Sequence, residues 1–491
     1  MKRRKFINVA GLGALTVLAA EKVFASNSKK DAGKWHIEQF KDKGLAHFSY
    51  AVLVDRKIII IDPERNPQIY YDFAKQNDAK IIGVIETHPH ADFASAHLEI
   101  HKSENATIYA SSLTKPAYPF TPFDDGNVIK LSDTVSLRSL YTPGHAPDHV
   151  AAVLQESGKD IAVFSGDALL IGDVGRPDLR DYSKDVLSQR KKLAGMMYNT
   201  IHQKFAKLDD DVIVYPAHGA GSLCGKAMRD VPSSTIGYEK AHNYAFEPRS
   251  EAEFVAILLS DLPFIPKYFP YDVGINIQGV PAIKTGIADV KLLQKNYRPD
   301  AKSLIIDGRS SAVFKNSYLT NAINIQDGGK FETWLGSVVP PNVPFYLVAA
   351  NDNDLAVLIT KSAKIGYELN ITGAFVYDAL DGNKFEEFNA ATFNPDSSKY
   401  TIIDVRTEKE VKEDKIFANS INIPLEDLSS RISEIPTNKP ILVNCASGYR
   451  SAAGSTIIKK YLPGQEVFDL GKAVTQYDEK NKEEEKKKNG N

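Results

Sequence analysis

The stretch IIGVIETHPHADF (residues 81–93) is the part of the sequence that most directly indicates the fold. Its first half is an apolar run of the length of a buried strand, and directly after it His88, His90 and Asp92 stand at alternate positions. Side chains placed in this way beyond a strand end converge on one point when the loop turns them inward. Because imidazole and carboxylate groups are metal ligands, this stretch predicts a metal site at the end of a strand.

Further apolar runs of strand length alternate with polar loops up to about Glu247, which predicts an α/β layered domain. The expected strands are Lys57–Asp62, Ile81–Thr87, Ala106–Ala110, Val135–Leu140, Asp160–Ser165 and Asp211–Tyr215. After three of these runs, TPGHAPDH supplies His145 and His149, FSGD supplies Asp167, and YPAHG supplies His218. Ligand-type residues at four separate strand ends predict one shared metal centre.

An internal repeat of roughly domain length follows. LIIDGR (residues 304–309) recurs as TIIDVR (residues 401–406), and NAINI (residues 321–325) recurs as NSINI (residues 419–423). Before the repeat, the stretch FIPKYFPYDVGINIQG (residues 264–279) is rich in proline, glycine and aromatic residues and predicts a packed connector. We therefore expect a metal domain, a connector and two copies of a second domain.

Composition and cysteine content narrow the classes of function. The chain has 491 residues, is 43% hydrophobic and 25% charged, and carries a formal net charge of −2. This is the composition of a soluble globular protein without a basic nucleic-acid surface. Two cysteines, Cys224 and Cys445, exclude a disulfide framework and a CxxC zinc site. Histidines and carboxylates are therefore the expected metal ligands, and Cys224 is expected to be a buried structural residue.

The first 25 residues, MKRRKFINVAGLGALTVLAAEKVFA, are typical of a signal peptide. Arg3 and Arg4, followed closely by Phe6, resemble the twin-arginine class, so an exported, periplasmic protein is expected. The apolar stretch of 15 residues (6–20) is short for a membrane span, and a short membrane anchor is the alternative. Loss of this segment removes five basic and one acidic side chain and leaves a charge of −6 on the mature chain.

The motifs HPHAD, TPGHAPDH, GDALLIGDVGRPDL and YPAHGAGSLCGK together resemble the metallo-β-lactamase fold, and within it the persulfide dioxygenases (sulfur dioxygenases) that are fused to rhodanese domains. The resemblance spans residues 35–478. It implies an α/β chain with an αββα sandwich followed by two rhodanese-like α/β domains. The expected segments are a signal peptide (1–25), a metallo-β-lactamase-like domain with its connector (26–285), a degenerate rhodanese-like domain (286–385), a rhodanese-like domain with Cys445 (386–478) and a charged tail (479–491).

The resemblance also implies one ferrous ion held by His88, His145 and Asp167, with positions left for O2 and substrate. The side chains expected to orient these ligands or water molecules are His90, Asp92 and His218. Two-metal members of the fold carry a further histidine where this chain has Phe93. Since a phenyl ring cannot coordinate a metal, a single metal is expected, with zinc as the alternative to iron.

The implied reaction is the oxidation of a low-molecular-weight persulfide, such as glutathione persulfide, by O2 to sulfite and a thiol. Arg176 and Asp178 follow Asp167 closely in the chain and are expected at the mouth of the site. There Arg176 would pair with a substrate carboxylate. The alternative is an Arg176–Asp178 pair that braces the loop.

The second repeat carries a candidate nucleophile. Strand Ile441–Asn444 leads into Cys445-Ala-Ser-Gly-Tyr-Arg450-Ser and a helix-like run, so loop N–H groups, a helix start and Arg450 favour the thiolate of Cys445. This form, with DVR (residues 404–406) upstream, resembles an active rhodanese, which implies that Cys445 carries a persulfide sulfur with Arg450 beside it in a catalytic role. The first repeat has Ala349 at the matching position and is expected to be structural or a docking surface.

The sequence thus predicts an exported persulfide dioxygenase linked to a sulfurtransferase that gives thiosulfate, in sulfide detoxification. The expected partners are a small persulfide, O2 and sulfite, with no nucleic acid and no membrane span in the mature chain. Two other classes stay open, a zinc-dependent thioester hydrolase of the glyoxalase II type and a non-enzymatic sulfur-carrier scaffold. The oligomeric state, a homo-oligomer included, is open as well.

Overall fold

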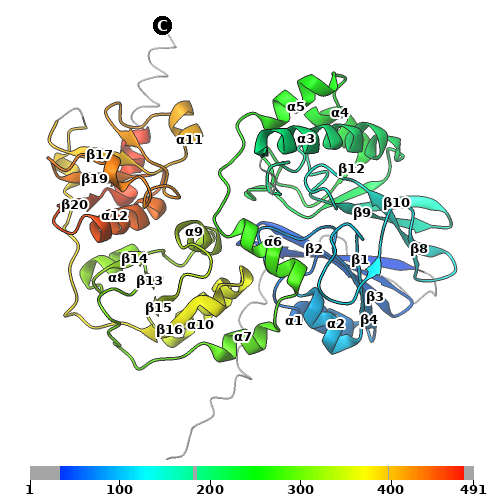
Figure 1. Cartoon of the computed structure of the whole chain (residues 1–491), viewed down its shortest axis with the longest axis horizontal. Coiled ribbons are helices and arrows are strands. Elements are labelled where there is room, and N and C mark those ends of the chain that lie inside the picture. The colour runs from blue at the N-terminus through cyan, green and yellow to red at the C-terminus, as the bar shows by residue number, and fades with distance from the viewer. Residues whose placement is uncertain (1–33, 181–184, 396–397, 480–491) are drawn as a thin grey trace, which may run out of the picture.

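A computed structural model describes residues 34–180, 185–395 and 398–479 of the chain. The first part forms two six-stranded sheets that pack face to face, with helices outside each sheet (Figure 1). The strand orders are β1-β2-β3-β4-β5-β6 and β12-β11-β10-β9-β8-β7. This is the αββα layering expected from the sequence. The predicted signal peptide (residues 1–25) and all but one residue of the predicted tail lie outside the described residues.

The elements of this first domain have the following bounds. The first sheet contains β1 (Trp35–Asp42), β2 (His47–Val54), β3 (Lys57–Ile61), β4 (Lys80–Ile85), β5 (Thr107–Ala110) and β6 (Thr121–Pro122). The second sheet contains β7 (Val128–Lys130), β8 (Val135–Tyr141), β9 (Val150–Glu156), β10 (Lys159–Gly166), β11 (Ile213–Pro216) and β12 (Ser234–Thr235). The helices are α1 (Gln68–Gln76), α2 (His97–Glu104), α3 (Val186–Gln203), α4 (Ile236–His242) and α5 (Glu251–Leu259).

Strand β3 shows why its sequence KIIII reads as a continuous apolar run. Ile59 and Ile61 lie in the core between the two sheets, and Ile58 and Ile60 lie in the core between the first sheet and helices α1 and α2. Side chains alternate across a strand, so a strand buried on both faces needs apolar residues at every position. The six predicted strands correspond to β3, β4, β5, β8, β10 and β11, with ends that differ by at most two residues.

Two four-stranded parallel sheets make up the remainder, in the orders β14-β13-β15-β16 and β18-β17-β19-β20. We call the units around them the first unit and the second unit. The first unit contains β13 (Ile305–Asp307), α8 (Ser311–Asn316), β14 (Ala322–Asn324), α9 (Phe331–Val338), β15 (Phe345–Ala349), α10 (Asp352–Lys364) and β16 (Ile371–Val376). The second unit contains β17 (Thr401–Asp404), α11 (Glu408–Glu413), β18 (Ile421–Asn422), β19 (Ile441–Asn444), α12 (Tyr449–Tyr461) and β20 (Val467–Asp469).

The repeat seen in the sequence is present in the topology. The LIIDGR and TIIDVR stretches form β13 and β17, each at the second position of its sheet. Asp307 pairs in register with Val348, and Asp404 pairs with Asn444, so Ala349 and Cys445 take equivalent places one residue further on. The assignment of the first unit as a rhodanese-like domain, and the expected domain boundaries, stay predictions.

The connector joins the domains through packed structure. It includes α6 (Phe269–Gln278) and α7 (Ile283–Asp289), and Figure 1 shows α6 between the first domain and the first unit. One apolar cluster runs from Phe93 through Tyr268 to Val467, and so spans all three parts of the molecule. Among the residues that the structure describes, no helix has both the length and the apolar character needed to cross a bilayer.

Candidate active site

His88, His145 and Asp167 meet where β4, β8 and β10 end. Their ligand atoms lie within 4.8 Å of one another, and all three side chains are buried. Asp167 Oδ2 lies 3.9 Å from His88 Nε2 and 3.5 Å from His145 Nε2. Within the described part of the chain, this buried oxygen accepts no hydrogen bond. A buried carboxylate oxygen that faces two imidazole nitrogens and lacks a donor fits a metal ion as its missing partner.

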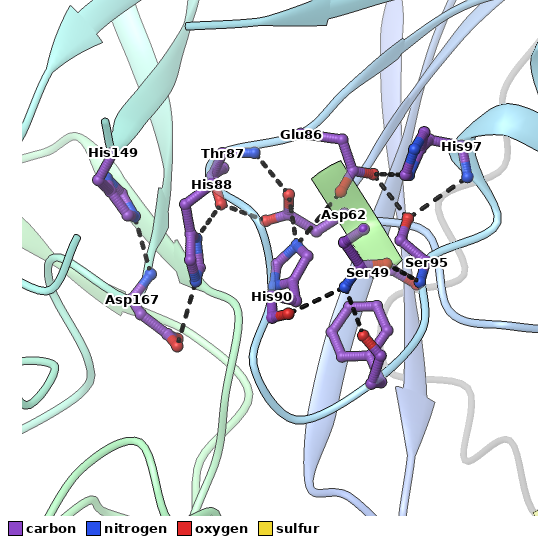
Figure 2. A network of polar contacts seen from close by, with 12 residues as sticks. Ser49, Asp62, Glu86, Thr87, His88, His90, Ser95, His97, His149 and Asp167 are labelled. Atoms are coloured by element: carbon purple, nitrogen blue, oxygen red, sulfur yellow. Dashed lines mark hydrogen bonds and ion pairs between the residues drawn. The ribbon is translucent and has the colours of Figure 1, made fainter. Parts of the chain in front are cut away.

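The orientation of His88 is set by a short hydrogen-bonded chain (Figure 2). Its Nδ1 lies 2.9 Å from Thr87 Oγ1, and that hydroxyl donates its proton to Asp62 Oδ2 at 2.9 Å. Because the Thr87 proton is used on Asp62, Nδ1 of His88 must be the protonated nitrogen of its ring. The unprotonated Nε2 therefore faces Asp167, as a metal ligand requires.

His145 is oriented in the same sense. Its Nδ1 donates to the Arg176 backbone carbonyl at 2.9 Å, which leaves the Nε2 lone pair directed at Asp167. A side chain at Gly175 would overlap the Asp167 carbonyl and crowd the His145 ring, so the GDVGRPDL motif needs glycine here. Burial lowers the pKa of His145, and burial with neighbouring histidines lowers that of His88. Both rings are thus neutral near pH 7.

His218 bridges two carboxylates. Its Nδ1 lies 2.7 Å from Asp167 Oδ1, and its Nε2 lies 2.7 Å from Asp92 Oδ2. Burial opposes the charged form, but Asp167 and Asp92 outweigh it and raise the pKa of His218 well above its ordinary value. Burial also opposes ionisation of Asp167, whereas the nearby histidines hold its pKa well below the ordinary value. This pairing fixes Asp167 and gives His218 and Asp92 the position expected of orienting residues.

His90 lies beside the three-residue cluster in a second polar layer (Figure 2). Its Nε2 is 3.1 Å from Asp62 Oδ1 and 3.8 Å from Glu86 Oε2, and its ring packs at 4.4 Å on both His88 and Phe93. Burial raises the pKa of Glu86 to about 8. His90 therefore supports His88 by packing and by its shared partner Asp62, and it makes no contact with Asp167 of the kind His218 makes.

The loop that carries His88 to Asp92 is held from outside the first domain. Asn276 on α6 donates from Nδ2 to the carbonyls of His90 and Phe93 at 2.9 and 2.7 Å, and its Oδ1 accepts the Ser95 N–H at 2.8 Å. In the first unit, the Lys364 carbonyl accepts the Ala94 N–H at 2.8 Å. The connector and the first unit thus help to fix the shape of the candidate metal site.

The expectation that Arg176 binds substrate is wrong. Its guanidinium makes two bonds to the Asp178 carboxylate, at 2.6 and 2.7 Å, and the others go to the carbonyls of Leu223, Pro263 and Phe264. These bonds use all five N–H groups of the side chain, and both Arg176 and Asp178 are buried. The physical reason is that the carbonyls of Pro263 and Phe264, where the connector begins, accept N–H groups of Arg176 that a substrate would otherwise use. These residues lie 87 and 88 positions further along the chain. The pair braces the loop, which is the alternative stated above.

Some residues of the site escape the sequence pattern. Asp62 accepts two hydrogen bonds from Thr87. It stands at the end of the apolar run KIIIID, as Asp167 stands after its own apolar run, so the sequence contains a signal that could have identified Asp62. Asn276 lies in the connector, far along the chain, and no local pattern marks it.

Cys224 is buried as expected, but its ligand atom also lies within 4.8 Å of those of Asp92 and His218. Burial raises the pKa of this thiol to about 12.

Cys445 lies at the end of β19, in front of α12. Its sulfur accepts the Gly448 N–H at 3.1 Å, and the thiol is buried. Gly448 has a φ of 93°, and a Cβ there would lie 2.7 Å from the Gly471 carbonyl carbon, so the tight loop needs glycine. The sulfur thus meets the N–H of Gly448, the residue directly before α12, as expected for a site that stabilises a thiolate or persulfide.

Arg450 is already paired. Its two terminal nitrogens donate to the Glu410 carboxylate at 2.6 Å each, and its guanidinium lies 5.8 Å from the Trp334 ring of the first unit. The Arg450 charge holds the pKa of Glu410 down at about 2, although burial alone would raise it. A cation bound in this way is held in one position in the loop, and the catalytic role expected for Arg450 beside Cys445 stays a prediction.

Comparison with known proteins gives matches to two protein families. A model of the metallo-β-lactamase superfamily matches residues 42–218, and a model of the rhodanese-like domain matches residues 387–480. The hydroxyacylglutathione hydrolase of Francisella philomiragia subsp. philomiragia is 31% identical over 182 residues, which are 36% of this chain and 65% of the relative. The chain therefore spans about two thirds, and not the full length, of that relative.

Among solved structures, the metallo-β-lactamase from Staphylococcus aureus subsp. aureus COL has a TM-score of 0.62 and 28% identity, covering 70% of this chain and 99% of that one. ETHE1 from Myxococcus xanthus has a TM-score of 0.41 and 25% identity, covering 49% and 97%. The metallo-β-lactamase match includes His88, His145 and Asp167, and the rhodanese-like match includes Cys445. The chain thus carries a metallo-β-lactamase αββα fold followed by a rhodanese-like domain.

Proposed function

We propose that the chain is an Fe(II)- and O2-dependent persulfide dioxygenase with a linked sulfurtransferase. The observation that carries this proposal is the set of three inward-facing ligands, His88 Nε2, His145 Nε2 and Asp167 Oδ2, in which the carboxylate oxygen is buried without a donor. Two histidines and one carboxylate are the ligand set of non-haem Fe(II) oxygenases, which leave positions for O2 and substrate. A rhodanese-like domain in the same chain supports sulfur as the reacting element.

When bound, a ferrous ion supplies the one-electron chemistry through which O2 reacts. The protein residues supply the rest. Thr87 and Asp62 hold the His88 ring in one tautomer, and the Arg176 carbonyl does so for His145. His218 holds Asp167 by its other oxygen and keeps Oδ2 free for the ion. The burial of every one of these groups excludes bulk water from the ligand set.

The proposed reaction is balanced as R–S–SH + O2 + H2O giving R–SH and sulfurous acid. The terminal sulfur is oxidised from the sulfane level to sulfite and loses four electrons, which reduce both oxygen atoms of O2. The S–S bond breaks, and the inner sulfur leaves as the thiol. Sulfurous acid releases its protons near neutral pH.

For the second site, we propose that the Cys445 thiolate takes a sulfane sulfur from a persulfide and passes it to sulfite, which gives thiosulfate. The donor loses its outer sulfur atom and leaves as a thiol, and the side chain of Cys445 becomes a persulfide. Transfer of that outer sulfur to sulfite returns Cys445 to the thiol. The Gly448 N–H, donated to the sulfur at 3.1 Å, supports the thiolate in both states. The link between the sites is tested by Cys445→Ser, because unaltered thiosulfate formation from persulfide in that variant would exclude the coupling.

A thioester hydrolase of the glyoxalase II type is the second candidate, and the name of the Francisella relatives favours it. Such a hydrolase uses a zinc-bound hydroxide, commonly with two metals, and the Phe93 side chain stands where a ligand of the second metal would be. Phe93 is buried between His47 and His90, at ring distances of 4.1 and 4.4 Å, and cannot coordinate. This packing favours the one-metal oxygenase.

The deciding experiment loads the metal-free full chain anaerobically with Fe(II) or with Zn(II). Each form is then given glutathione persulfide with O2, and separately a glutathione thioester. The proposal predicts O2 uptake and sulfite release by the iron form alone, with one O2 consumed per persulfide. Thioester cleavage by the zinc form without O2 uptake by the iron form would establish the hydrolase. A chain that binds neither metal and turns over neither substrate would establish a scaffold.

We also propose that residues 1–25 direct twin-arginine export to the periplasm, on the strength of Arg3, Arg4 and the apolar stretch after them. Expression of the full chain followed by cell fractionation tests this. The expected result is a periplasmic protein lacking its first residues, and retention in the cytoplasm when Arg3 and Arg4 are both changed to Lys. Equal export of that variant would exclude the twin-arginine route.

A further inference from the structure

The first unit binds the helix that follows the Cys445 loop. The Tyr449 hydroxyl, at the start of α12, donates to the Gln326 carbonyl at 2.6 Å, and the Thr456 hydroxyl accepts the Asn324 N–H at 3.1 Å. Tyr449 and Thr456 stand about two turns apart on α12 and so share one of its faces. This face of the helix is therefore held against the first unit.

Trp334 on α9 adds a third contact, and this one involves Arg450. The Arg450 guanidinium lies 5.8 Å from the centre of the Trp334 ring, within the range of a cation–π contact. The same guanidinium donates two hydrogen bonds to Glu410, at 2.6 Å each. Glu410 belongs to the second unit and Trp334 to the first, so the position of Arg450 depends on both units.

Trp334 is itself held in place by the connector. Its side chain is buried, and its ring stacks on that of Phe264 at 5.7 Å, with an angle of 21° between the two planes. The Phe264 carbonyl accepts a hydrogen bond from Arg176 of the first domain at 3.1 Å. A ring fixed in this way is a rigid surface that can position a flexible cation.

The position of Arg450 matters for Cys445, which begins the same CxxxxR loop. Burial opposes the charged form of Arg450, but Glu410 outweighs it and, with a smaller effect of Cys445, raises the pKa of Arg450. The cation and the sulfur thus lie within electrostatic reach of each other. A fixed cation at this distance stabilises negative charge on the thiolate or on a persulfide.

We propose that Trp334 is a positioning residue of the sulfurtransferase site, supplied by the first unit. It holds Arg450 where its charge stabilises the ionised Cys445. This inference rests on the proposed sulfur transfer at Cys445. It gives the first unit, which has Ala349 in place of the nucleophile, a part in the reaction of the second unit.

The test compares two replacements of Trp334 in the iron-loaded full chain. Trp334→Leu keeps an apolar side chain and loses the aromatic face, whereas Trp334→Phe keeps such a face. Sulfur transfer from glutathione persulfide to cyanide should fall at least ~5-fold in Trp334→Leu and stay within ~2-fold in Trp334→Phe. O2 uptake should be unchanged in both. Equal transfer rates in the two variants, or a parallel loss of O2 uptake, would overturn the positioning role.

Phe385→Leu is the matched control. The Phe385 ring lies 5.4 Å from Nζ of Lys459, which is also on α12, so this variant removes a contact of the same kind near the other end of the helix. Its sulfur transfer should be unchanged, and a loss equal to that of Trp334→Leu would contradict a specific role of Trp334. Transfer that persists in Cys445→Ser would instead exclude the proposed function itself.

Trp334 also provides a spectroscopic signature. The chain has two tryptophans, so Trp35→Phe leaves Trp334 as the only one. Glutathione persulfide, added without oxygen, should change the Trp334 emission as the loaded Cys445 attracts Arg450, and cyanide should reverse the change. No change should occur when Cys445→Ser is added. An emission that is the same before and after loading would contradict the link from Cys445 through Arg450 to Trp334.

Discussion

The two repeated units contain the same internal hydrogen bonds. They differ in the residues that follow β15 in the first unit and β19 in the second. Both contain a buried Asp-x-Arg motif, at residues 307–309 and 404–406, in which the Arg side chain binds the Asp carboxylate. In both, an Asn side chain, the buried Asn324 or the half-buried Asn422, donates from Nδ2 to two backbone carbonyls of that motif at 2.9 and 2.8 Å. This shared framework shows that the fold of the repeat does not depend on the thiol of Cys445.

The difference lies in the few residues after β15 and β19. In the second unit, Cys445 is followed by a loop whose Gly448 N–H meets the sulfur. In the first unit, a single residue separates Ala349 from Asn351, which caps α10, and two carboxylates lie in the first turn of that helix. Negative charge at a helix start opposes a thiolate. The first unit instead supports the metal loop, through the Lys364 carbonyl and an ion pair of Glu368 with Arg65.

The largest effect is expected at the nucleophile. Cys445→Ser should lower sulfur transfer from a persulfide donor to cyanide by at least ~10³-fold, because the attacking atom is lost. Placing a thiol at the equivalent position, Ala349→Cys in that variant, should restore nothing, since the α10 start carries carboxylates and lacks the long loop. Thiocyanate formation measures both. Recovered activity in the double variant would show that the two units differ only in the thiol.

The next effect concerns the supporting role of the first unit. Arg65 Nη2 donates to Glu368 Oε1 at 2.8 Å, and both side chains are fully buried. Glu368→Ala leaves a buried charge without its partner and should cost ~3–5 kcal/mol of unfolding free energy. The matched control is Glu386→Ala, which breaks a partly exposed pair with Lys459 and should cost below ~1 kcal/mol. Equal urea midpoints for the two variants would contradict the supporting role of the first unit.

A smaller, pH-dependent effect separates the units. Burial raises the pKa of Glu426 in the second unit to about 7, from 4.5, whereas the first unit has Gly328 at the matching position. The folded state therefore keeps the Glu426 proton to about pH 7, and the unfolded state loses it near pH 4.5, so this residue lowers stability progressively between these values.

Glu426→Gln should accordingly change stability little at pH 5 and raise it by ~1–3 kcal/mol at pH 8. Urea unfolding at the two pH values measures the difference. A gain of the same size at pH 5, or a loss at pH 8, would contradict the buried and protonated state of this carboxyl.

The smallest effect tests the shared framework itself. Asn324→Ala and Asn422→Ala each remove the same pair of hydrogen bonds, and each should cost ~1–3 kcal/mol. The two losses should be similar, and they should add in the double variant because the sites share no partner. Unfolding of the three variants checks this. A loss confined to one unit would show that the units are held together differently in spite of their common sequence pattern.

The sequence predicts those parts of the site that local patterns encode. His88, His145 and Asp167 each follow an apolar run, and the ends of neighbouring strands meet at one edge, so their convergence could be expected from the chain alone. The register of Ala349 with Cys445 follows in the same way from the repeat. The layered fold follows from strand-length apolar runs with intervening polar loops.

Contacts between distant segments could not be predicted. The Arg176 side chain is bound by Asp178 and by carbonyls that include that of Phe264 in the connector. Asn276 holds the loop of the candidate metal site from α6, and Cys224 reaches Asp92 across more than 120 positions. Periodicity and spacing describe neighbours along the chain, whereas these side chains are selected by packing between domains. For the same reason the Arg450 partner, Glu410 on the first helix of the second unit, has no signature in the CxxxxRS loop.

The most direct test of the account measures both chemistries in two variants of the iron-loaded full chain. O2 uptake and sulfur products are recorded with glutathione persulfide for Asp167→Asn and for Cys445→Ser. We predict that Asp167→Asn loses O2 uptake and keeps sulfur transfer to cyanide, and that Cys445→Ser keeps O2 uptake and releases sulfite in place of thiosulfate. O2 uptake that persists in Asp167→Asn, or that fails in Cys445→Ser, would contradict two separate sites in one chain.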